Sequence, residues 1–101
     1  MRTSQLMIDE HGITRRGRRA TVISAAAVRN IHVFSDADGS DCLVVRGARL
    51  RLLPIRRDDL ASPTVRAGAR ALVDAVRATA TATVDPEVDR YLEAFEHHVA
   101  S

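Results

Sequence analysis

Hydrophobic and polar residues alternate through the first half of the chain, which is the pattern of β-strands that bury one face. The clearest case is the segment 29–35, where Ile31 and Val33 fall on one face and His32 and Phe34 on the other. The same alternation recurs in five other short segments between turn-forming residues. It predicts six strands, at residues 5–10, 13–16, 18–23, 29–35, 42–46 and 49–54.

Glycine, aspartate and small residues mark the connections between these strands. Gly17 is either the tip of a hairpin or a bulge within one longer, bent strand. Residues 25–27, which are all alanine, form either one helical turn or a tight crossing. Residues 36–40 predict a tight turn, because Asp and Ser bond to their own backbone and Gly39 accepts a positive φ.

The last two predicted strands form a hairpin around residues 47–48. Its register is expected to place Leu43 and Val45 on the same face as Leu50 and Leu52. Pro54 should end the final strand, because proline has no N–H to donate to a neighbouring strand.

From residue 62 onward the hydrophobic period changes to that of an α-helix. Ser62 is a good N-cap, and Pro63 suits the first helical position. One apolar stripe follows, made of Val65, Ala69, Leu72, Val73, Val76 and Ala80. The β-branched residues in the segment 79–84 weaken the helical pattern, and Asp85 starts a second helix.

Strands followed by helices predict an α+β fold. We expect an antiparallel sheet, or a partly open barrel, of about six strands followed by two C-terminal helices. The expected organisation is one domain over residues 1–84 and a helical extension over residues 85–101.

The last predicted helix carries its own apolar stripe, which contains the only tyrosine of the chain and one of its two phenylalanines. A small domain with so few aromatic residues has little core area, and self-association is one way to add to it. We therefore expect this stripe to form an interface with a second copy of the chain, through Val88, Tyr91, Leu92 and Phe95.

The basic residues of the chain are all arginines and lie mostly in its first half. Residues 1–57 hold eleven arginines and five acidic residues, whereas residues 58–101 hold four arginines and eight acidic residues. The densest cluster, Arg15, Arg16, Arg18 and Arg19, predicts a binding patch for phosphate or another anion. The alternative interpretation is a solvated strand edge that its charges protect from aggregation. No aromatic residues are interleaved for base stacking, so nucleic acid is not the expected partner.

No combination of residues matches a catalytic signature, so we expect no enzymatic activity and no cofactor. Glu93 and His97 share a helical face, but they offer fewer ligands than a zinc site needs. The segment 36–41 resembles the start of a calcium loop, yet Gly47 stands where the bidentate glutamate would be. We therefore expect no metal site.

The distribution of charged and apolar residues also indicates where in the cell the protein is expected. The longest uncharged run, residues 20–28, is about half as long as a membrane-spanning helix needs to be. The first residues lack the hydrophobic core of a secretory signal, and the single Cys42 cannot form a disulfide within the chain. We expect a cytoplasmic protein without a membrane span.

The order of the predicted elements resembles that of the bacterial pleckstrin-homology-like domains. The residues that carry the resemblance are Gly12–Ile13–Thr14–Arg15, the segment Val28–Arg29–Asn30–Ile31–His32–Val33, and Leu53–Pro54 ahead of the helix. It covers roughly residues 5–80, and the family has seven strands where the pattern here predicts six. The resemblance implies a two-sheet, partly open barrel closed at one end by the helix. It also implies a binding role, since members of that fold bind lipids, peptides or their own copies.

These observations lead to an expected function. We expect a noncatalytic interaction or scaffolding module whose partner is another protein or a second copy of the chain. The alternative is an arginine-dependent protein that binds an anion, a lipid headgroup or nucleic acid.

Overall fold

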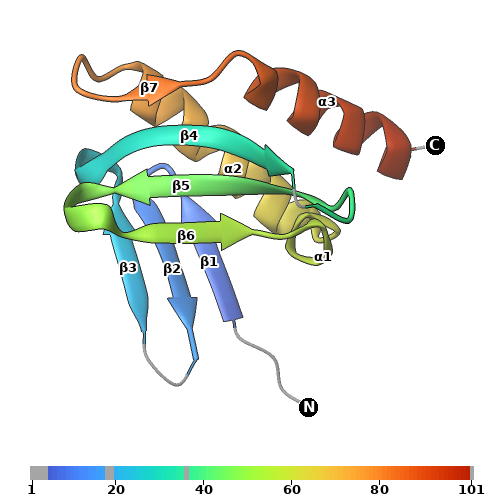
Figure 1. Cartoon of the computed structure of the whole chain (residues 1–101), viewed down its shortest axis with the longest axis horizontal. Coiled ribbons are helices and arrows are strands. Elements are labelled where there is room, and N and C mark those ends of the chain that lie inside the picture. The colour runs from blue at the N-terminus through green and yellow to red at the C-terminus, as the bar shows by residue number, and fades with distance from the viewer. Residues whose placement is uncertain (1–4, 18–19, 36, 101) are drawn as a thin grey trace.

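The chain folds into two open β-sheets with helices packed on one side (Figure 1). The computed structural model describes the backbone of residues 5–17, 20–35 and 37–100, and the side chains of residues 6–17, 20–35 and 37–96. In this part of the chain the elements are β1 (Gln5–Asp9), β2 (Gly12–Arg16), β3 (Thr21–Ser24), β4 (Val28–Ser35), β5 (Asp41–Gly47), β6 (Leu52–Ile55), α1 (Arg57–Leu60), α2 (Pro63–Arg77), β7 (Thr83–Val84) and α3 (Glu87–Ala100). The predicted α+β class is confirmed, with strands first and the two long helices at the C-terminal end.

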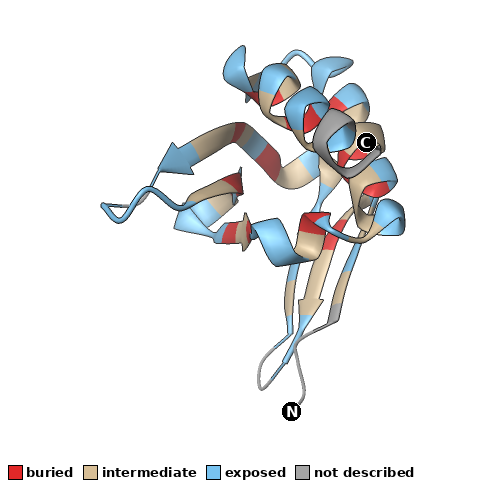
Figure 2. Ribbon diagram, turned by 90° about the vertical axis from the view of Figure 1, so that its right-hand side faces the viewer, coloured by how far each residue is buried: buried red, intermediate tan, exposed pale blue. Residues whose placement is uncertain are grey.

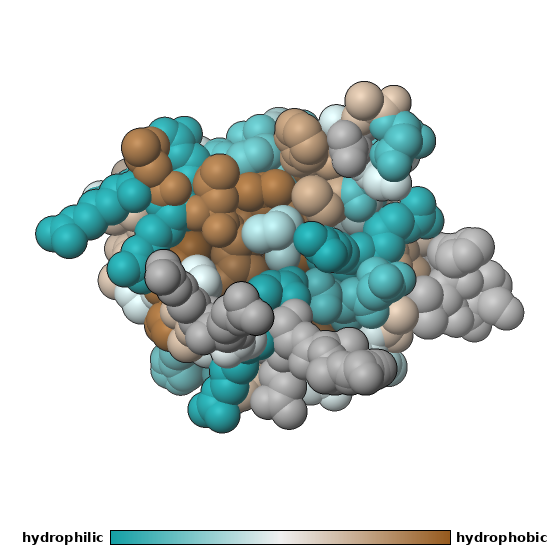
Figure 3. Space-filling view, turned by 60° about the horizontal axis from the view of Figure 1, so that its bottom comes forward, coloured by the Kyte–Doolittle hydropathy of each residue, from teal (hydrophilic) through white to brown (hydrophobic). Residues whose placement is uncertain are grey.

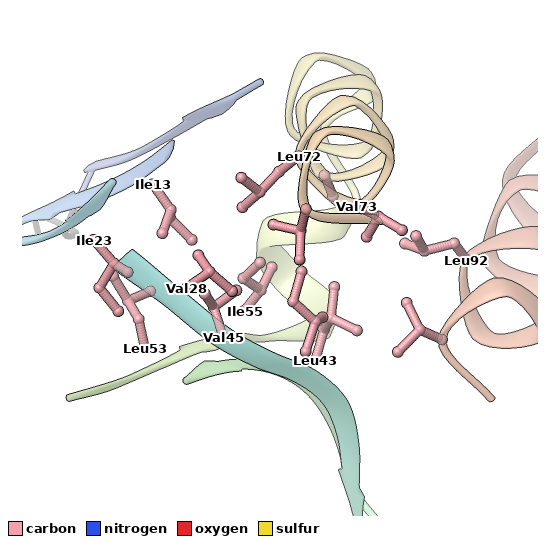
Figure 4. Packing of buried hydrophobic residues seen from close by; sticks show 14 of the residues in the cluster. Ile13, Ile23, Val28, Leu43, Val45, Leu53, Ile55, Leu72, Val73 and Leu92 are labelled. Carbon is pink, nitrogen blue, oxygen red and sulfur yellow. The ribbon is translucent and has the colours of Figure 1, made fainter. Parts of the chain in front are cut away.

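The strands β1, β2 and β3 form one antiparallel sheet, and the other four form a second sheet in the order β6–β5–β4–β7. In Figure 1 the strands of the two sheets run across each other, with α2 behind them. Figure 4 shows the core that fills the space between these layers: Ile13 and Ile23 come from the first sheet, Val45 from the second, and Leu72 from α2. All four side chains are almost completely buried.

The backbone decides two questions that the sequence left open in the first half of the chain. Thr21 pairs with Arg15, so β2 and β3 are separate strands of a hairpin, and Gly17 is not a bulge in one strand. Ala25–Ala27 forms a short 3₁₀ turn that carries the chain from the first sheet into the second.

The predicted register of β6 was wrong. Leu43 pairs with Ile55 and Val45 pairs with Leu53, so Leu53 and Ile55 face the core. Because successive side chains of a strand point to opposite faces, this register turns Leu52 outward. Pro54 does not end the strand, since β6 lies at the edge of its sheet, where a missing N–H is tolerated.

A seventh strand, β7, was not predicted. Its two residues pair in parallel with Asn30 and Ile31 of β4. The Asn30 side-chain amide reinforces the pair by donating to the Thr83 hydroxyl oxygen at 2.9 Å and to the Asp85 carboxylate at 3.1 Å.

The helix α2 begins as the sequence predicts. Ser62 caps it by accepting a hydrogen bond from the Val65 amide at 3.4 Å, and Pro63 occupies the first helical position. The stripe is buried at Ala69, Leu72, Val73 and Val76. Gly68 also faces the core, because α2 passes so close to β1 that only a residue without a side chain fits there.

The helix α3 packs against β4 and α2 of its own chain. Val88 is fully buried, and Leu92 is 2% exposed in the common core. Tyr91 and Phe95 are half-buried against that core, and the Tyr91 hydroxyl lies 3.4 Å from the Asp41 carbonyl oxygen, to which it donates. Of the residues expected at an interface with a second copy, Val88 and Leu92 are buried in the core of their own chain, and Tyr91 and Phe95 pack against that core with part of each side chain exposed. The interface itself stays a prediction. Residues predicted as an extension thus contribute to the same core as the residues before them.

Asp89 ties α3 to α2 through two arginines. Its carboxylate accepts hydrogen bonds from Arg70 at 2.8 Å and from Arg77 at 2.9 and 2.5 Å. The Arg77 hydrogen bonds, followed by the one from Arg70, lower the pKa of Asp89 to about 2. In the unfolded chain the pKa should be about 3.9, so folding favours the ionised carboxylate.

We expect the Asp89 contribution to stability to be present above about pH 4 and to be lost as the pH falls toward about 2. Asp89 is 38% exposed, so its replacement in Asp89→Asn should lower the free energy of unfolding by no more than about 1 kcal/mol. Urea unfolding at a series of pH values measures this difference, which should shrink under acid conditions. The matched change Glu93→Gln, at an exposed position of α3, should have no such effect. A difference of constant size at every pH would contradict the assignment.

Candidate binding surface on the four-stranded sheet

The two described members of the predicted arginine patch, Arg15 and Arg16, differ in their surroundings. Arg15 is partly buried between the two sheets, where its Nη2 donates to the Pro54 carbonyl oxygen at 2.9 Å and to Asp59 at 2.8 Å. Arg16, the next residue of β2, is exposed. Arg18 and Arg19 lie outside the described residues. Arg15 therefore holds β2 against β6 and α1. The expectation that the four arginines bind an external anion stays a prediction.

Replacing Arg15 by alanine is expected to lower the free energy of unfolding by about 1–3 kcal/mol, because the partly buried Asp59 carboxylate loses its cation. The side chains of both partners are less than a quarter exposed, at 23% and 19%. Arg16→Ala removes the same charge from an exposed position and should change stability by less than about 0.5 kcal/mol. Thermal or urea unfolding of the two variants measures the difference. Equal effects would show that the Arg15–Asp59 pair contributes nothing specific.

The face of the four-stranded sheet that points away from the core is also largely apolar. The register places Phe34 beside Cys42 and His32 beside Val44, and Val44 in turn pairs with Pro54. At the edge of this outer face, Leu52 is 58% exposed, and Phe34 is 53% exposed. A strand that is apolar on both faces is normally covered on both faces. In the part of the chain that the structure describes, only the inner face is covered by the helices and the other sheet.

This outer face is hollowed. The hollow has a volume of about 960 Å³ and is lined by the residues His32, Phe34, Ser40, Asp41, Cys42, Val44, Arg46, Leu52, Pro54, Arg56, Arg57 and Asp58. Its floor is apolar and its charged residues lie at the rim. Figure 3 shows this side of the molecule, with hydrophobic side chains gathered in the middle and hydrophilic ones around them. Figure 2 shows the four-stranded sheet as a curved layer with the helices on one side of it.

The electrostatic balance of the rim is positive. Arg46 lies at one end of the hollow, next to the β5–β6 connection, and Arg56 and Arg57 lie at the other end, at the start of α1. Asp41 and Asp58 are the acidic residues of the lining. The Asp41 carboxylate already accepts a hydrogen bond from the Ser35 hydroxyl at 2.7 Å.

Sequence reasoning missed this surface for one reason. The predicted register placed Leu52 on the inner face of β6. The predicted outer face therefore lacked the residue that is most exposed there. The signal that was present is the uninterrupted apolar run Leu43–Val44–Val45 in β5, which indicates a strand with two apolar faces.

No three His, Cys, Asp or Glu side chains among the described residues lie close enough to hold a metal ion. The side chain of His97, which the sequence pairs with Glu93 on one helical face, lies outside that part of the chain. None of the described helices combines the length and the apolar content that crossing a lipid bilayer requires.

Comparison with known proteins finds no relative of this chain. No protein family, no characterised protein and no solved structure matches the chain.

Proposed function

We propose that the chain is a noncatalytic interaction module that binds a segment of another protein in the hollow of its outer face. The observation that carries the proposal is the exposure of Phe34 and Leu52 on either side of an apolar floor. Exposed apolar surface of this kind, rimmed by polar residues, is typical of a protein interaction site. The resemblance in element order to pleckstrin-homology-like domains, whose members have binding roles, is in keeping with this function.

The rim defines the chemistry of the partner. Its three arginines outnumber its two acidic residues, and arginine binds carboxylates through two parallel hydrogen bonds. The best complement is therefore a segment with apolar side chains in the middle and acidic side chains at its ends. Arginine is also enriched among the residues that dominate binding energy at interfaces.

A second copy of the chain fits this face less well. In a two-fold symmetric pair the same surface patch contacts itself. Because both ends of the hollow carry arginines, such a face-to-face pair would bring arginines of one copy close to arginines of the other. Like charges so placed oppose association.

The test uses the chain to select binders from a phage-displayed library of random peptides. We expect the enriched peptides to contain apolar residues flanked by Asp or Glu. Leu52→Asp places a charge beside the apolar floor and should weaken their binding by at least about tenfold. The matched control Met7→Asp changes a residue of similar exposure, 55%, in the three-stranded sheet and should leave binding unchanged.

Both substitutions are at exposed positions, so both variants should keep the fold, which circular dichroism checks. Failure to enrich any peptide would contradict the proposal. So would peptides whose affinity falls equally in both variants or in neither. Dimerisation of the wild-type chain that Leu52→Asp abolishes would instead assign the face to a second copy.

A further inference from the structure

A second hollow lies at the end of the four-stranded sheet where β4 begins and β5 ends. It has a volume of about 620 Å³ and is lined by Arg29, Asn30, Arg46, Gly47, Ala48, Arg49, Leu50 and Thr83. Its three arginines come from three different elements: the start of β4, the end of β5 and the turn between β5 and β6. In Figure 1 this end of the sheet is at the left, beside β7. We call these lining residues the arginine hollow.

The arginine hollow contains no negative charge. No acidic residue is part of its lining, and Arg29, Arg46 and Arg49 are all exposed. Within the described residues none of the three forms an ion pair. Asp85, which follows β7, is held by the Asn30 amide at 3.1 Å. Arginines from three elements thus line one space, and no acidic residue belongs to that lining.

The turn that presents Arg49 is strained. Arg49 has φ 59° and ψ 38°, Leu50 has φ 62°, and the Arg51 amide donates to the Ala48 carbonyl oxygen at 3.3 Å. This is the arrangement of a type I′ turn, which usually takes Asn-Gly because both central residues need positive φ. For residues with a side chain that conformation costs about 1–2 kcal/mol each. Strain of this kind persists where the surrounding structure holds it, and it is concentrated at functional sites.

The chemistry of the arginine hollow favours a ligand with more than one negative charge. A single carboxylate can be satisfied by one guanidinium, whereas a phosphate monoester carries nearly two charges and three acceptor oxygens. Arginine presents its donors in a fork that matches phosphate oxygens. The Thr83 hydroxyl, in the same lining, is a further polar group at the site.

We infer that the arginine hollow is a binding site for a phosphate monoester group. This inference goes beyond the proposed function and does not depend on it, since it concerns other residues except for the shared Arg46. The inferred anion site lies on the four-stranded sheet, whereas the sequence predicted one at the arginine cluster that includes Arg16 of the three-stranded sheet.

The experiment titrates the ¹⁵N-labelled chain with inorganic phosphate and with glycerol 3-phosphate and follows backbone amide and arginine Nε–H signals by NMR. Acetate at equal ionic strength is the monoanion control. We expect saturable shifts centred on Arg29, Arg46 and Arg49, with a dissociation constant on the order of 1 mM or tighter. Acetate should produce no saturable shift at these residues.

Matched variants separate this site from general charge effects. Arg29→Gln and Arg49→Gln should each weaken phosphate binding about fivefold to tenfold, the loss expected for a charged hydrogen bond near solvent. Arg16→Gln removes the same charge from the three-stranded sheet and should leave binding unchanged. Arg46→Gln is less informative, because Arg46 also lines the outer face.

A vesicle arm identifies the source of the phosphate group. Leu50 is 83% exposed beside the arginine hollow, where it would reach the apolar layer below a lipid headgroup. If the group belongs to a lipid, vesicles containing phosphatidylinositol 4-phosphate will retain the chain, and Leu50→Ser will release it. If the group belongs to a soluble molecule, Leu50→Ser will leave the affinity for glycerol 3-phosphate unchanged and vesicles will not retain the chain. Absence of saturable binding in every arm, or an equal loss in Arg16→Gln, would overturn the inference.

Discussion

Replacing Gly68 by alanine is expected to lower the free energy of unfolding by about 3 kcal/mol, the upper part of the range for inserting atoms into a packed core. Elsewhere in a helix the same substitution stabilises by about 1 kcal/mol, because alanine has the higher helix propensity. The sign reverses here because a Cβ atom on Gly68 would lie 2.0 Å from the Ile8 carbonyl oxygen. That oxygen belongs to the backbone of β1, so relieving the clash requires the helix and the strand to move apart.

Urea unfolding of the variant measures the loss. Ala67, the exposed neighbour of Gly68 in α2, provides the control, since Ala67→Gly should cost only about 1 kcal/mol from propensity. If Gly68→Ala were as stable as the wild type, the contact between α2 and β1 would be adjustable, and the close approach would not be a constraint on the fold.

Removing residues 85–101 is expected to abolish the cooperative unfolding transition. The deletion takes Val88 and Leu92 out of the core and exposes the surface of β4 and α2 that α3 covers. Each large side chain lost from a core costs about 2–5 kcal/mol. The free energy of unfolding of a whole domain is only about 5–15 kcal/mol. The loss of two such side chains and their helix therefore leaves too little stability for a cooperative transition.

A point variant makes the same test with less disruption. Leu92→Ala should lower the free energy of unfolding by about 2–4 kcal/mol, whereas Glu93→Ala, at the exposed neighbouring position, should change it by less than about 0.5 kcal/mol. A truncated chain that remains a folded monomer would show that α3 is dispensable and would restore the stripe as a candidate interface.

The fold class was predictable from the sequence because hydrophobic period is a local signal. The change of period at Ser62 and the N-cap and proline there gave the start of α2 correctly. The register of β6 was not predictable, because the β5–β6 turn is built from Arg49 and Leu50 and carries no glycine or asparagine to mark its centre. The strand β7 could not be found from sequence, since two residues hold no period and the strand exists only by pairing with β4.

The candidate sites were harder to predict, because they depend on which distant residues meet. Arg15 and Arg16 are identical in chemistry and adjacent in sequence, yet Arg15 meets Asp59, which lies 44 residues away, and Arg16 faces solvent. The arginine hollow unites residues from β4, β5 and the turn after it, which no local pattern brings together. Alternation within β2 does predict that neighbouring side chains point to opposite faces, and that rule would have separated Arg15 from Arg16.

The parallel pairing of β7 with β4 has a consequence for how fast the protein folds and unfolds. Asn30 and Thr83 are 53 residues apart, whereas the hairpins of both sheets join strands that follow one another directly. Closing a longer loop costs more chain entropy. We therefore expect the hairpins to form first, and β7 and the helix that follows it, α3, to dock onto them afterwards. Substitutions in the β4–β5 hairpin will therefore slow folding. Substitutions in α3 will leave the folding rate nearly unchanged and accelerate unfolding, so the lifetime of the native state depends on the segment that docks last.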